Sequence, residues 1–353
     1  MPSLMLPEFP TDVPTHPLLV INYERLKAGD EAEIEKLWGA ATSLGFWYLN
    51  NHGADELAEG MFEMARETMQ LPMEEKLKFE QGDEGNSFGY KAAGANAVDA
   101  TGTLDTVEFI NVAKDDALAW PASARRTYPS TVNANMERVI TPFVKKSLEV
   151  NTTILGIFSR KLGLPEDAFE KRHRLDEFSG SETRVIKNPP TPNSPLKVAI
   201  GAHTDFGSLS FLHNRLGGLQ VLPPGYEEWQ FIKPLSGHAI CNIGDALSLF
   251  SGGILRSNLH RVVPPPGLQS AHERWSLVFF TRPGNSIELR ALVEDSPLIA
   301  DAVARSPDPT KFETKCTALE WFTRRIKNQR MKNRKGPETW MQSRGTEHRV
   351  EAR

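Results

Sequence analysis

Eight short apolar runs, each followed by a turn rich in glycine, proline or polar residues, lie between residues 181 and 285. They read TRVIKNPP, KVAIGAHTDF, SLSFLH, GGLQVLPP, EWQFIKPL, HAICNIGDAL, SNLHRVVPPP and RWSLVFFTRP. Parallel strands need long crossover connections, usually helices, and the spacing between these runs leaves little room for them. The pattern therefore predicts a β-sandwich or barrel rather than a parallel sheet.

This predicted core is one of five segments along the chain, and the fold class is expected to be mixed and β-rich. The segments are an N-terminal region of helices and strands that packs on the core (1–130), a long helical segment (131–180), the β core (181–285), a C-terminal helical segment (286–335) and a polar tail (336–353).

Local signals predict where several of the flanking elements begin and end. Asp30 is expected to cap a helix over residues 31–44, and Gly45 to stop it. The long helical segment contains Pro142, where we expect a kink. Residues 80–104 are rich in glycine, asparagine and alanine, and predict a long loop.

Composition and charge argue against several classes of protein. The formal net charge of −4 gives no bulk attraction to nucleic acid, and the two cysteines provide neither a disulfide framework nor a CxxC site. No apolar run is long enough to cross a membrane, and the proline-rich start lacks the pattern of a signal peptide, so a cytoplasmic protein is expected. The basic run over residues 324–335 is interpreted as a solvated helix face, because no aromatic platform interleaves its charges.

Two candidate metal ligands stand two residues apart in the run GAHTDFGSL. In a strand, side chains i and i+2 point to the same face, so His203 and Asp205 would lie side by side. They could be a coincidence of composition, a buried hydrogen-bonded pair or part of a metal site. His260, in the strand-like run SNLHRVV, would complete a facial triad of the kind that binds Fe(II) and leaves three positions open. Structural zinc would need a fourth ligand, which neither cysteine is placed to supply.

The run RWSLVFF places an arginine on one face of a predicted strand together with a hydroxyl. Alternation puts Arg274, Ser276, Val278 and Phe280 on that face. A guanidinium inside an apolar strand is costly unless it meets an anion. Arg274 and Ser276 could bind a carboxylate, or Arg274 could form a buried structural salt bridge, and the strand alone leaves both interpretations open.

The order of several runs along the chain carries further information. The second half contains GAHTDFGSLSFL, GGLQVL, CNIGDAL, SNLHRVV and RWSLVFF, and the first half contains LLVINYERL, LGFWYLNNHG, LPMEEKLKF and SFGY. In this order the chain resembles the iron(II)/2-oxoglutarate-dependent oxygenases, in particular the isopenicillin N synthase-like branch. The resemblance covers roughly residues 15–330, and several motifs in register are more specific than any single one.

The resemblance implies a double-stranded β-helix (jelly roll) and an Fe(II)/2-oxoglutarate-dependent dioxygenase that uses O2. By position it assigns His203, Asp205 and His260 to iron, and Arg274 and Ser276 to the distal carboxylate of 2-oxoglutarate. It also implies oxidation of an unactivated C–H bond of a small metabolite, by hydroxylation, desaturation or ring formation, in secondary metabolism.

One strand departs from the family pattern. The run TRVIKNPP carries Ile186 and Asn188 where family members often have an asparagine and a tyrosine that help to hold the co-substrate. Asn188 is therefore expected to contact 2-oxoglutarate with a shorter amide. Because of this departure, an alternative function stays open: an Fe(II) oxidase or oxidative cyclase that takes no oxo acid. A non-catalytic jelly-roll binding module with a structural metal is a further alternative, and three ligands without a fourth argue against it.

Contacts to the primary substrate are expected from Arg184, from the strand around Phe109, from the C-terminal segment and from a lid over residues 85–98. A cation at the position of Arg184 is expensive unless an anion arrives, so the substrate is expected to be an acidic small molecule. The alternative is a salt bridge from Arg184 to an acid such as Glu108.

The other histidines are interpreted as structural. His52, His213 and His238 lie in or beside predicted strands without a second ligand at metal spacing. His173 and His272 sit in charged stretches and are expected to be exposed. We therefore expect no catalytic role for these five side chains.

Overall fold

The computed structural model describes residues 6–122, 125–192 and 198–346. The N-terminal region alternates helices with strands. Its elements are β1 (Val20–Asn22), α1 (Tyr23–Lys27), α2 (Glu31–Ser43), β2 (Phe46–Asn50), α3 (Asp55–Gln70), α4 (Met73–Leu77), β3 (Gly89–Lys91), β4 (Glu108–Ala113) and α5 (Lys114–Ala117). The helical segment that follows consists of α6 (Ser130–Asn135), a π-helical turn (Met136–Ile140) and α7 (Thr141–Lys161), with a short 3-10 helix after it (Glu170–Arg172).

Each of the eight predicted runs overlaps a strand, which confirms the mixed, β-rich class. The strands are β5 (Glu182–Asn188), β6 (Ile200–His203), β7 (Leu209–Asn214), β8 (Leu219–Val221), β9 (Gln230–Phe231), β10 (His238–Ile243), β11 (His260–Val262) and β12 (Arg274–Thr281). Helix α8 (Asp245–Phe250) follows β10, and a 3-10 helix (Gly267–Ala271) precedes β12. The C-terminal elements are β13 (Glu288–Arg290), α9 (Pro297–Ala304), a 3-10 helix (Pro309–Phe312), β14 (Glu313–Thr317), α10 (Ala318–Gln329), a 3-10 helix (Met331–Asn333) and α11 (Pro337–Gln342).

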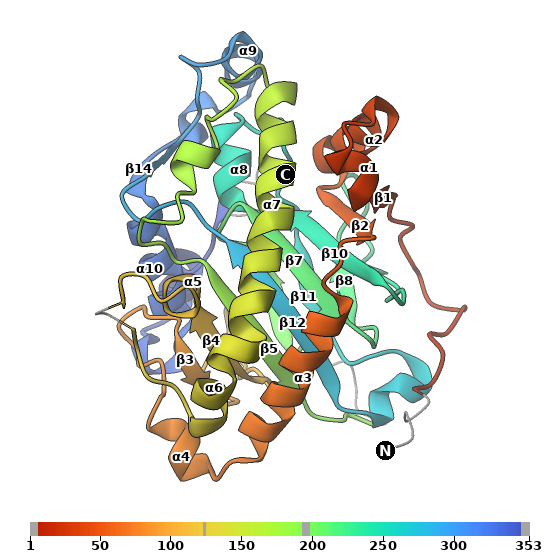
Figure 1. Cartoon of the computed structure of the whole chain (residues 1–353), viewed down its shortest axis with the longest axis vertical. Coiled ribbons are helices and arrows are strands. Elements are labelled where there is room, and N and C mark those ends of the chain that lie inside the picture. Colours follow the sequence, from red (N-terminus) through yellow and green to blue (C-terminus); the bar gives the residue numbers. More distant parts are fainter. Residues whose placement is uncertain (1–5, 123–124, 193–197, 347–353) are drawn as a thin grey trace.

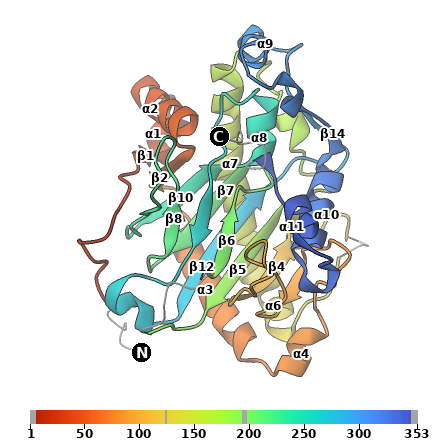
Figure 2. The same cartoon turned by 180° about the vertical axis from the view of Figure 1, so that it is seen from behind.

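Two sheets enclose the interior of the protein. The eight-stranded sheet has the order β1-β2-β10-β7-β12-β5-β4-β3, and the four-stranded sheet has the order β6-β11-β8-β9. Within them, β1 and β2 pair in parallel and the other neighbours pair antiparallel. Helices α3 and α7 cover one face of the large sheet (Figure 1), and the reverse view shows β6 and β8 of the small sheet in front of the other face (Figure 2). Side chains of both sheets line one cavity, which therefore lies between them.

The ends of α2 follow the signals in the sequence. The carboxylate of Asp30 accepts a hydrogen bond from the backbone N–H of Glu33 at 3.1 Å, which satisfies one of the free donors of the first turn. Gly45 follows the helix with φ +77°, in the left-handed region that glycine adopts at little cost. A side chain at Gly45 would also collide with the carbonyl of Arg256. Both the backbone conformation and this close contact therefore require glycine.

The irregularity expected at Pro142 takes the form of the π-helical turn. Proline has no N–H to donate, and its ring crowds the carbonyl four residues earlier, which belongs to Arg138. Arg138 lies within the π-helical turn, where the backbone is wound more widely, and regular α-helix resumes at Thr141.

Two expectations about the flanking segments hold only in part. Residues 80–104 are not a loop throughout, because β3 lies within them and pairs with β4. The basic run is a solvated face only in part, because Lys327, Lys332 and Lys335 are exposed whereas Arg325 and Arg330 are 0% and 1% exposed. Charge alone does not reveal burial when each cation finds acidic or carbonyl partners inside the protein.

The segment expected to be a polar tail is ordered in its first part. Residues 337–342 form α11, and Ser343 and Gly345 are buried, while residues 347–353 lie outside the described residues. In the described part of the chain, no helix combines the length and the apolar character that crossing a bilayer requires.

Candidate metal centre

Two histidines and one aspartate meet where β6 ends and β11 begins. His203 and His260 are cross-strand partners in the small sheet. Asp205 lies two residues beyond the end of β6 rather than inside the strand. Its Oδ1 lies 3.8 Å from Nε2 of His203 and 3.7 Å from Nε2 of His260. One candidate ligand atom from each residue lies within 4.8 Å of the other two, a separation at which the three can hold one metal ion.

Hydrogen bonds on the far side of each imidazole determine which nitrogen faces the site. Nδ1 of His203 donates to the carbonyl of Gly201 at 2.7 Å, and Nδ1 of His260 donates to the carbonyl of Asn258 at 3.2 Å. Each Nε2 therefore carries a lone pair that faces Asp205. Burial and the neighbouring His260 lower the pKa of His203 to about 3, so this imidazole is neutral at neutral pH, as a metal ligand must be.

The second carboxylate oxygen of Asp205 is held by the large sheet. Oδ2 accepts a hydrogen bond from Oγ of Ser210 on β7 and another, at 2.7 Å, from Nδ2 of Asn242 on β10. Burial by itself would raise the pKa of Asp205, but the facing imidazoles and these two hydrogen bonds lower it to about 2. The sequence interpretation missed Ser210 and Asn242, although a polar residue inside each apolar run, SLSFLH and HAICNI, was the available signal.

A cavity of about 620 Å³ extends from the triad between the two sheets. Arg274 and Ser276 of β12 both line it, as the alternation predicted. Arg274 is 3% exposed, and its guanidinium donates to the carbonyl of Gly217 at 2.6 Å and to Oγ of Ser276 at 2.5 Å. No carboxylate among the described residues forms an ion pair with it, which argues against the structural salt bridge. Burial lowers the pKa of Arg274 to about 10, which still leaves the side chain charged at neutral pH.

Asn188, the residue expected beside the co-substrate, is not one of the described residues that line the cavities at the triad. It pairs with Arg274 across β5 and β12 and is buried. Its Oδ1 accepts a hydrogen bond from Oγ1 of Thr106 at 3.0 Å. Ile186, two residues earlier on the same strand, does line the cavity. A contact between Asn188 and the co-substrate stays a prediction.

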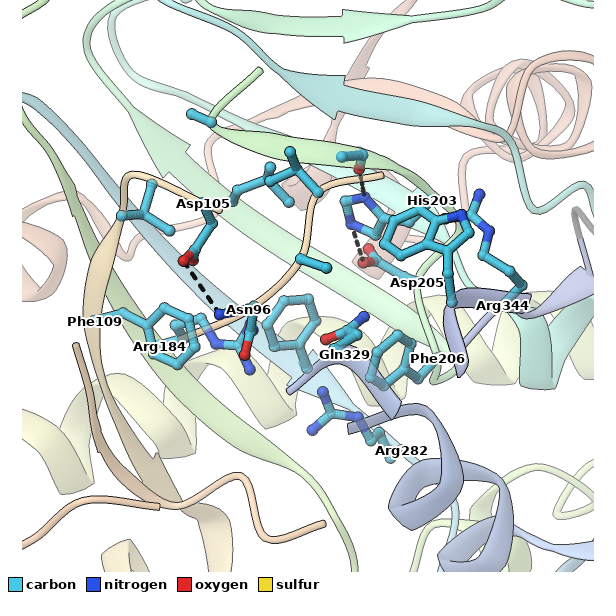
Figure 3. Close-up of a pocket in the computed structure, with 18 residues that line it drawn as sticks. Asn96, Asp105, Phe109, Arg184, His203, Asp205, Phe206, Arg282, Gln329 and Arg344 are labelled. Atoms are coloured by element: carbon cyan, nitrogen blue, oxygen red, sulfur yellow. Dashed lines mark hydrogen bonds and ion pairs between the residues drawn. The ribbon is translucent and has the colours of Figure 1, made fainter. Parts of the chain in front are cut away.

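A second cavity, of about 700 Å³, also reaches the triad (Figure 3). His203 and Asp205 line both cavities, so the triad lies where the two meet. The polar and aromatic side chains that line the second cavity are Asn96, Asp105, Phe109, Arg184, Phe206, Phe280, Arg282, Gln329, Trp340 and Arg344. Arg184 and Phe109, which the sequence predicts to contact the substrate, both line this cavity, together with residues of the C-terminal segment.

Arg184 lines both cavities and is held in a polar network. Its Nε donates to Oδ1 of Asn111 at 2.8 Å, and its Nη2 donates to the carboxylate of Glu182 at 2.9 Å and to Oγ of Ser87 at 3.2 Å. The guanidinium also lies 4.3 Å from the centre of the Phe109 ring. Arg184 thus has an internal acidic partner and an aromatic neighbour.

The acidic partner of Arg184 is not Glu108, and the salt bridge considered for that pair is absent. Glu108 pairs across the sheet with Lys187, whereas Arg184 pairs with Asn111. Since side chains alternate along a strand, Lys187 and Arg184 point to opposite faces of β5, and Glu108 lies on the face of Lys187. Its carboxylate accordingly forms ion pairs with Lys187 at 3.5 Å and Lys76 at 3.0 Å.

The expectation that His173 is exposed is wrong. Its Nδ1 lies 2.7 Å from the carbonyl of Phe169, its Nε2 lies 2.7 Å from Oγ of Ser208, and burial lowers its pKa to about 4. His173 is half-buried, and the charged residues that precede it in the sequence concealed this. His52 and His213 are buried against each other with ring centres 5.2 Å apart, and burial lowers the pKa of both, that of His213 to about 3.

Two family models match the chain. The model of the 2OG-Fe(II) oxygenase superfamily matches residues 180–283, and that of the N-terminal region of non-haem dioxygenases in morphine synthesis matches residues 18–133. A 2-oxoglutarate-dependent dioxygenase of Gibberella zeae is 30% identical over 290 residues, which cover 80% of this chain and 85% of the relative. The chain belongs to the 2-oxoglutarate- and Fe(II)-dependent oxygenases.

This oxygenase has further relatives in plants and in solved structures. Homoarginine-6-hydroxylase of Oryza sativa is 30% identical over 258 residues, which cover 70% of this chain and 76% of the relative. The crystal structure of a full-length Neurospora crassa protein in complex with α-ketoglutarate superposes with a TM-score of 0.71 at 20% identity, covering 91% of this chain and 99% of that one, and supports the fold. The family confirms that the oxygenase is an enzyme that uses Fe(II) and 2-oxoglutarate.

Proposed function

We propose that His203, Asp205 and His260 hold Fe(II), and that Arg274 and Ser276 bind the distal carboxylate of 2-oxoglutarate. One observation carries the proposal: three ligand atoms that face one another and a buried guanidinium without a carboxylate partner among the described residues line the same cavity. Two imidazoles and one carboxylate fit Fe(II) and leave three positions of an octahedral ion for other ligands.

The groups around the cavity have separate tasks. Arg274 offers parallel N–H donors that match a carboxylate, and Ser276, whose oxygen accepts from Arg274, retains its own O–H to donate. Ser210 and Asn242 hold Oδ2 of Asp205 so that Oδ1 faces the metal position. Bound iron and 2-oxoglutarate together supply the oxidative decarboxylation to succinate and CO2 that drives oxidation of a substrate C–H bond.

The second cavity would take the primary substrate, which we propose is a small acidic molecule. Arg184 and Arg282 both line this cavity, and both bind Oε1 of Glu182, at 2.9 and 3.2 Å. Two guanidinium groups that share one buried carboxylate leave a positive charge in excess, and an anionic substrate would compensate it. Phe109 and Phe280 flank Arg184, which suits a substrate with an apolar body beside its acidic group.

Two relatives are named after reactions of small amino acids, which carry a carboxylate, and this supports a small carboxylate substrate here. They are the homoarginine-6-hydroxylase of Oryza sativa and a 1-aminocyclopropane-1-carboxylate oxidase of Dictyostelium discoideum, which is 28% identical over 317 residues and covers 78% of this chain. The proposed reaction is hydroxylation, desaturation or ring formation at an unactivated C–H bond of a metabolite in secondary metabolism. The N-terminal match to dioxygenases of morphine synthesis supports this setting.

We also propose that residues 181–285 form a double-stranded β-helix (jelly roll). Antiparallel strands in two sheets around one cavity support this assignment. Among the described residues, the N-terminal region 6–122 and the helical segment 131–180 would buttress the large sheet, and residues 286–346 would close the substrate side.

Succinate formation tests the proposed function. Purified protein is supplied with Fe(II), 2-oxoglutarate and O2, and succinate is quantified with and without a panel of small aromatic and aliphatic carboxylic acids. We expect succinate to form and at least one acid to accelerate it. Oxidation of an acid without succinate would instead support the oxidase that takes no oxo acid. Iron-loaded protein that produces neither succinate nor an oxidised acid would contradict the proposal.

A further inference from the structure

A buried carboxylate joins the metal centre to the C-terminal segment. Asp245, the first residue of α8, is 0% exposed. Its Oδ1 accepts hydrogen bonds from Oγ of Ser257 at 3.0 Å and Oγ1 of Thr346 at 2.6 Å, and its Oδ2 accepts from Arg325 and from the N–H of Thr346 at 3.3 Å. The N–H of Asp245 in turn donates to the carbonyl of Asp205 at 2.9 Å. Asp245 thus links a proposed iron ligand, through its backbone N–H, to Thr346 in the C-terminal segment, through its side chain.

Arg325 of α10 extends the same network. Its Nη2 donates to the carbonyl of Thr204 at 2.8 Å, and its Nε donates to the carbonyl of Ser343 at 3.1 Å. Thr204 lies between His203 and Asp205 in the sequence. A fully buried ion pair is stable only when its remaining donors and acceptors are satisfied. Here the C-terminal segment and the loop between two proposed iron ligands satisfy them.

The path of the C-terminal segment past this ion pair requires a glycine. A Cβ atom on Gly345 would overlap Oδ2 of Asp245 and Nη1 of Arg325. Any larger residue would push the segment away from the ion pair. The close approach is therefore a specific fit of the segment to the ion pair.

The segment held in this way carries two residues of the second cavity. Trp340 and Arg344 both line it. In Figure 3, Arg344 lies on the side opposite Arg184 and Phe109. Arg344 donates a hydrogen bond to the carbonyl of Ala202, and its guanidinium lies 4.8 Å from the centre of the Trp340 ring. Arg344 therefore lies beside the strand that ends in His203, and Trp340 lies beside Arg344.

We propose that residues 343–346 are a C-terminal clamp through which Asp245 positions Trp340 and Arg344 as determinants of primary-substrate binding. This inference rests on the proposed function, because it treats the second cavity as the substrate site. Asp245, Gly345 and Thr346 are positioning residues. Loosening the clamp should weaken binding of the primary substrate and leave 2-oxoglutarate affinity unchanged, because Trp340 and Arg344 line the second cavity and Arg274 lines the first.

A pair of substitutions at Thr346 isolates the hydrogen bond to Asp245. Thr346→Val keeps the shape of the side chain and removes the hydroxyl, whereas Thr346→Ser keeps the hydroxyl and serves as the conservative control. Gly345→Ala forces the overlap, and Gly39→Ala in α2, where a Cβ meets no atom within 4 Å, is its matched control. Hydrogen–deuterium exchange followed by mass spectrometry reports on residues 337–346 of each protein without depending on activity.

We expect exchange over residues 337–346 to become at least tenfold faster in Thr346→Val and Gly345→Ala, and to match the wild type in Thr346→Ser and Gly39→Ala. With the carboxylic acid that most accelerates wild-type succinate formation as the probe, its KM should rise at least tenfold in the two loosened variants. The dissociation constant of 2-oxoglutarate, measured without O2, should stay within twofold.

Unchanged exchange in both loosened variants would overturn the clamp. Faster exchange with an unchanged KM for the acid would show that the segment is held but does not position substrate contacts, which also overturns the inference. If no acid accelerates the wild type, the acidic-substrate proposal fails, and the exchange comparison still decides whether Asp245 holds the segment.

Discussion

Arg274 is a buried cation that donates to a carbonyl and a hydroxyl, and this makes it the most informative single residue of the site. Losing one partner of a desolvated charge pair costs about 2–5 kcal/mol. Arg274→Ala should therefore weaken the binding of 2-oxoglutarate by that amount. The dependence of succinate formation on the concentration of 2-oxoglutarate measures the effect. An unchanged dependence on 2-oxoglutarate would contradict the assignment and favour a role toward the carboxylate of the primary substrate.

Two milder substitutions serve as controls for this arginine. Arg274→Lys should recover only part of the lost affinity, because an ammonium cannot form two parallel bonds to a planar carboxylate. Ser276→Ala removes one hydroxyl donor and should cost about 1 kcal/mol of 2-oxoglutarate binding.

Arg184 binds Glu182 and also lines the proposed substrate cavity, so its substitution should affect both the stability of the fold and the binding of substrate. Arg184→Met leaves the buried Glu182 with Arg282 as its remaining cation, so the free energy of unfolding should fall by about 1–3 kcal/mol. The same change should weaken binding of an acidic substrate and leave iron affinity nearly unchanged. The affinity for 2-oxoglutarate is measured as well, because Arg184 lines both cavities. Urea unfolding and the KM of the acid measure the two effects. Loss of stability with an unchanged KM would assign Arg184 to structure alone.

At the scale of elements, strands β7 and β10 of the large sheet orient Asp205, the proposed iron ligand that follows β6 of the small sheet. Asn242 on β10 and Ser210 on β7 both bind Oδ2 of Asp205. Outer hydrogen-bond partners of this kind typically contribute a factor of about 10–100 in metal affinity. Asn242→Ala should lower Fe(II) affinity by about that factor, measured by competition with a chelator, while far-UV circular dichroism stays native. Wild-type affinity would show that Ser210 alone holds the carboxylate.

The elements of the core could be predicted from the sequence because their signals are local. The strands between residues 181 and 285 are set off by glycine and proline, and the two ends of α2 carry their own cap and stop residues. His203, Asp205 and His260 could be nominated for the same reason, since each stands in a recognisable run. Whether they would lie within reach of one another depended on the pairing of β6 with β11.

The remaining contacts depend on segments that are distant in the sequence. Strand β3 is short and lies in a glycine-rich stretch, so it forms because β4 offers it a partner. The basic run in and after α10 looks solvated until Asp245, eighty residues earlier, is found beside Arg325. No local pattern indicates that Trp340 and Arg344 belong to the cavity, because their polar sequence context resembles a tail.

At the scale of the whole molecule, buried neutral histidines make stability depend on pH. Burial lowers the pKa of His213 from 6.5 to about 3, so below pH 6.5 the unfolded chain binds a proton that the folded protein does not. Stability therefore falls as the pH falls, by about 2 kcal/mol for this one group between pH 7 and pH 5.

His213→Phe isolates that contribution, because phenylalanine suits the aromatic surroundings of Phe211 and Phe143. Urea unfolding of the metal-free proteins at pH 7 and pH 5 should show a loss of stability that is about 2 kcal/mol smaller in the variant. Equal losses in the two proteins would mean that His213 is protonated in the folded state.

The central claim is that one iron and one 2-oxoglutarate bind together at His203, Asp205 and His260. Anaerobic titration of Fe(II)-loaded protein with 2-oxoglutarate tests it most directly, since chelation of the iron by the oxo acid produces a charge-transfer absorption. The wild type should bind one iron per chain and develop this absorption with one equivalent of 2-oxoglutarate. Asp205→Ala and His260→Ala should keep a native circular dichroism spectrum, bind no stoichiometric iron and develop no absorption. Near-wild-type iron content and absorption in either variant would contradict the claim.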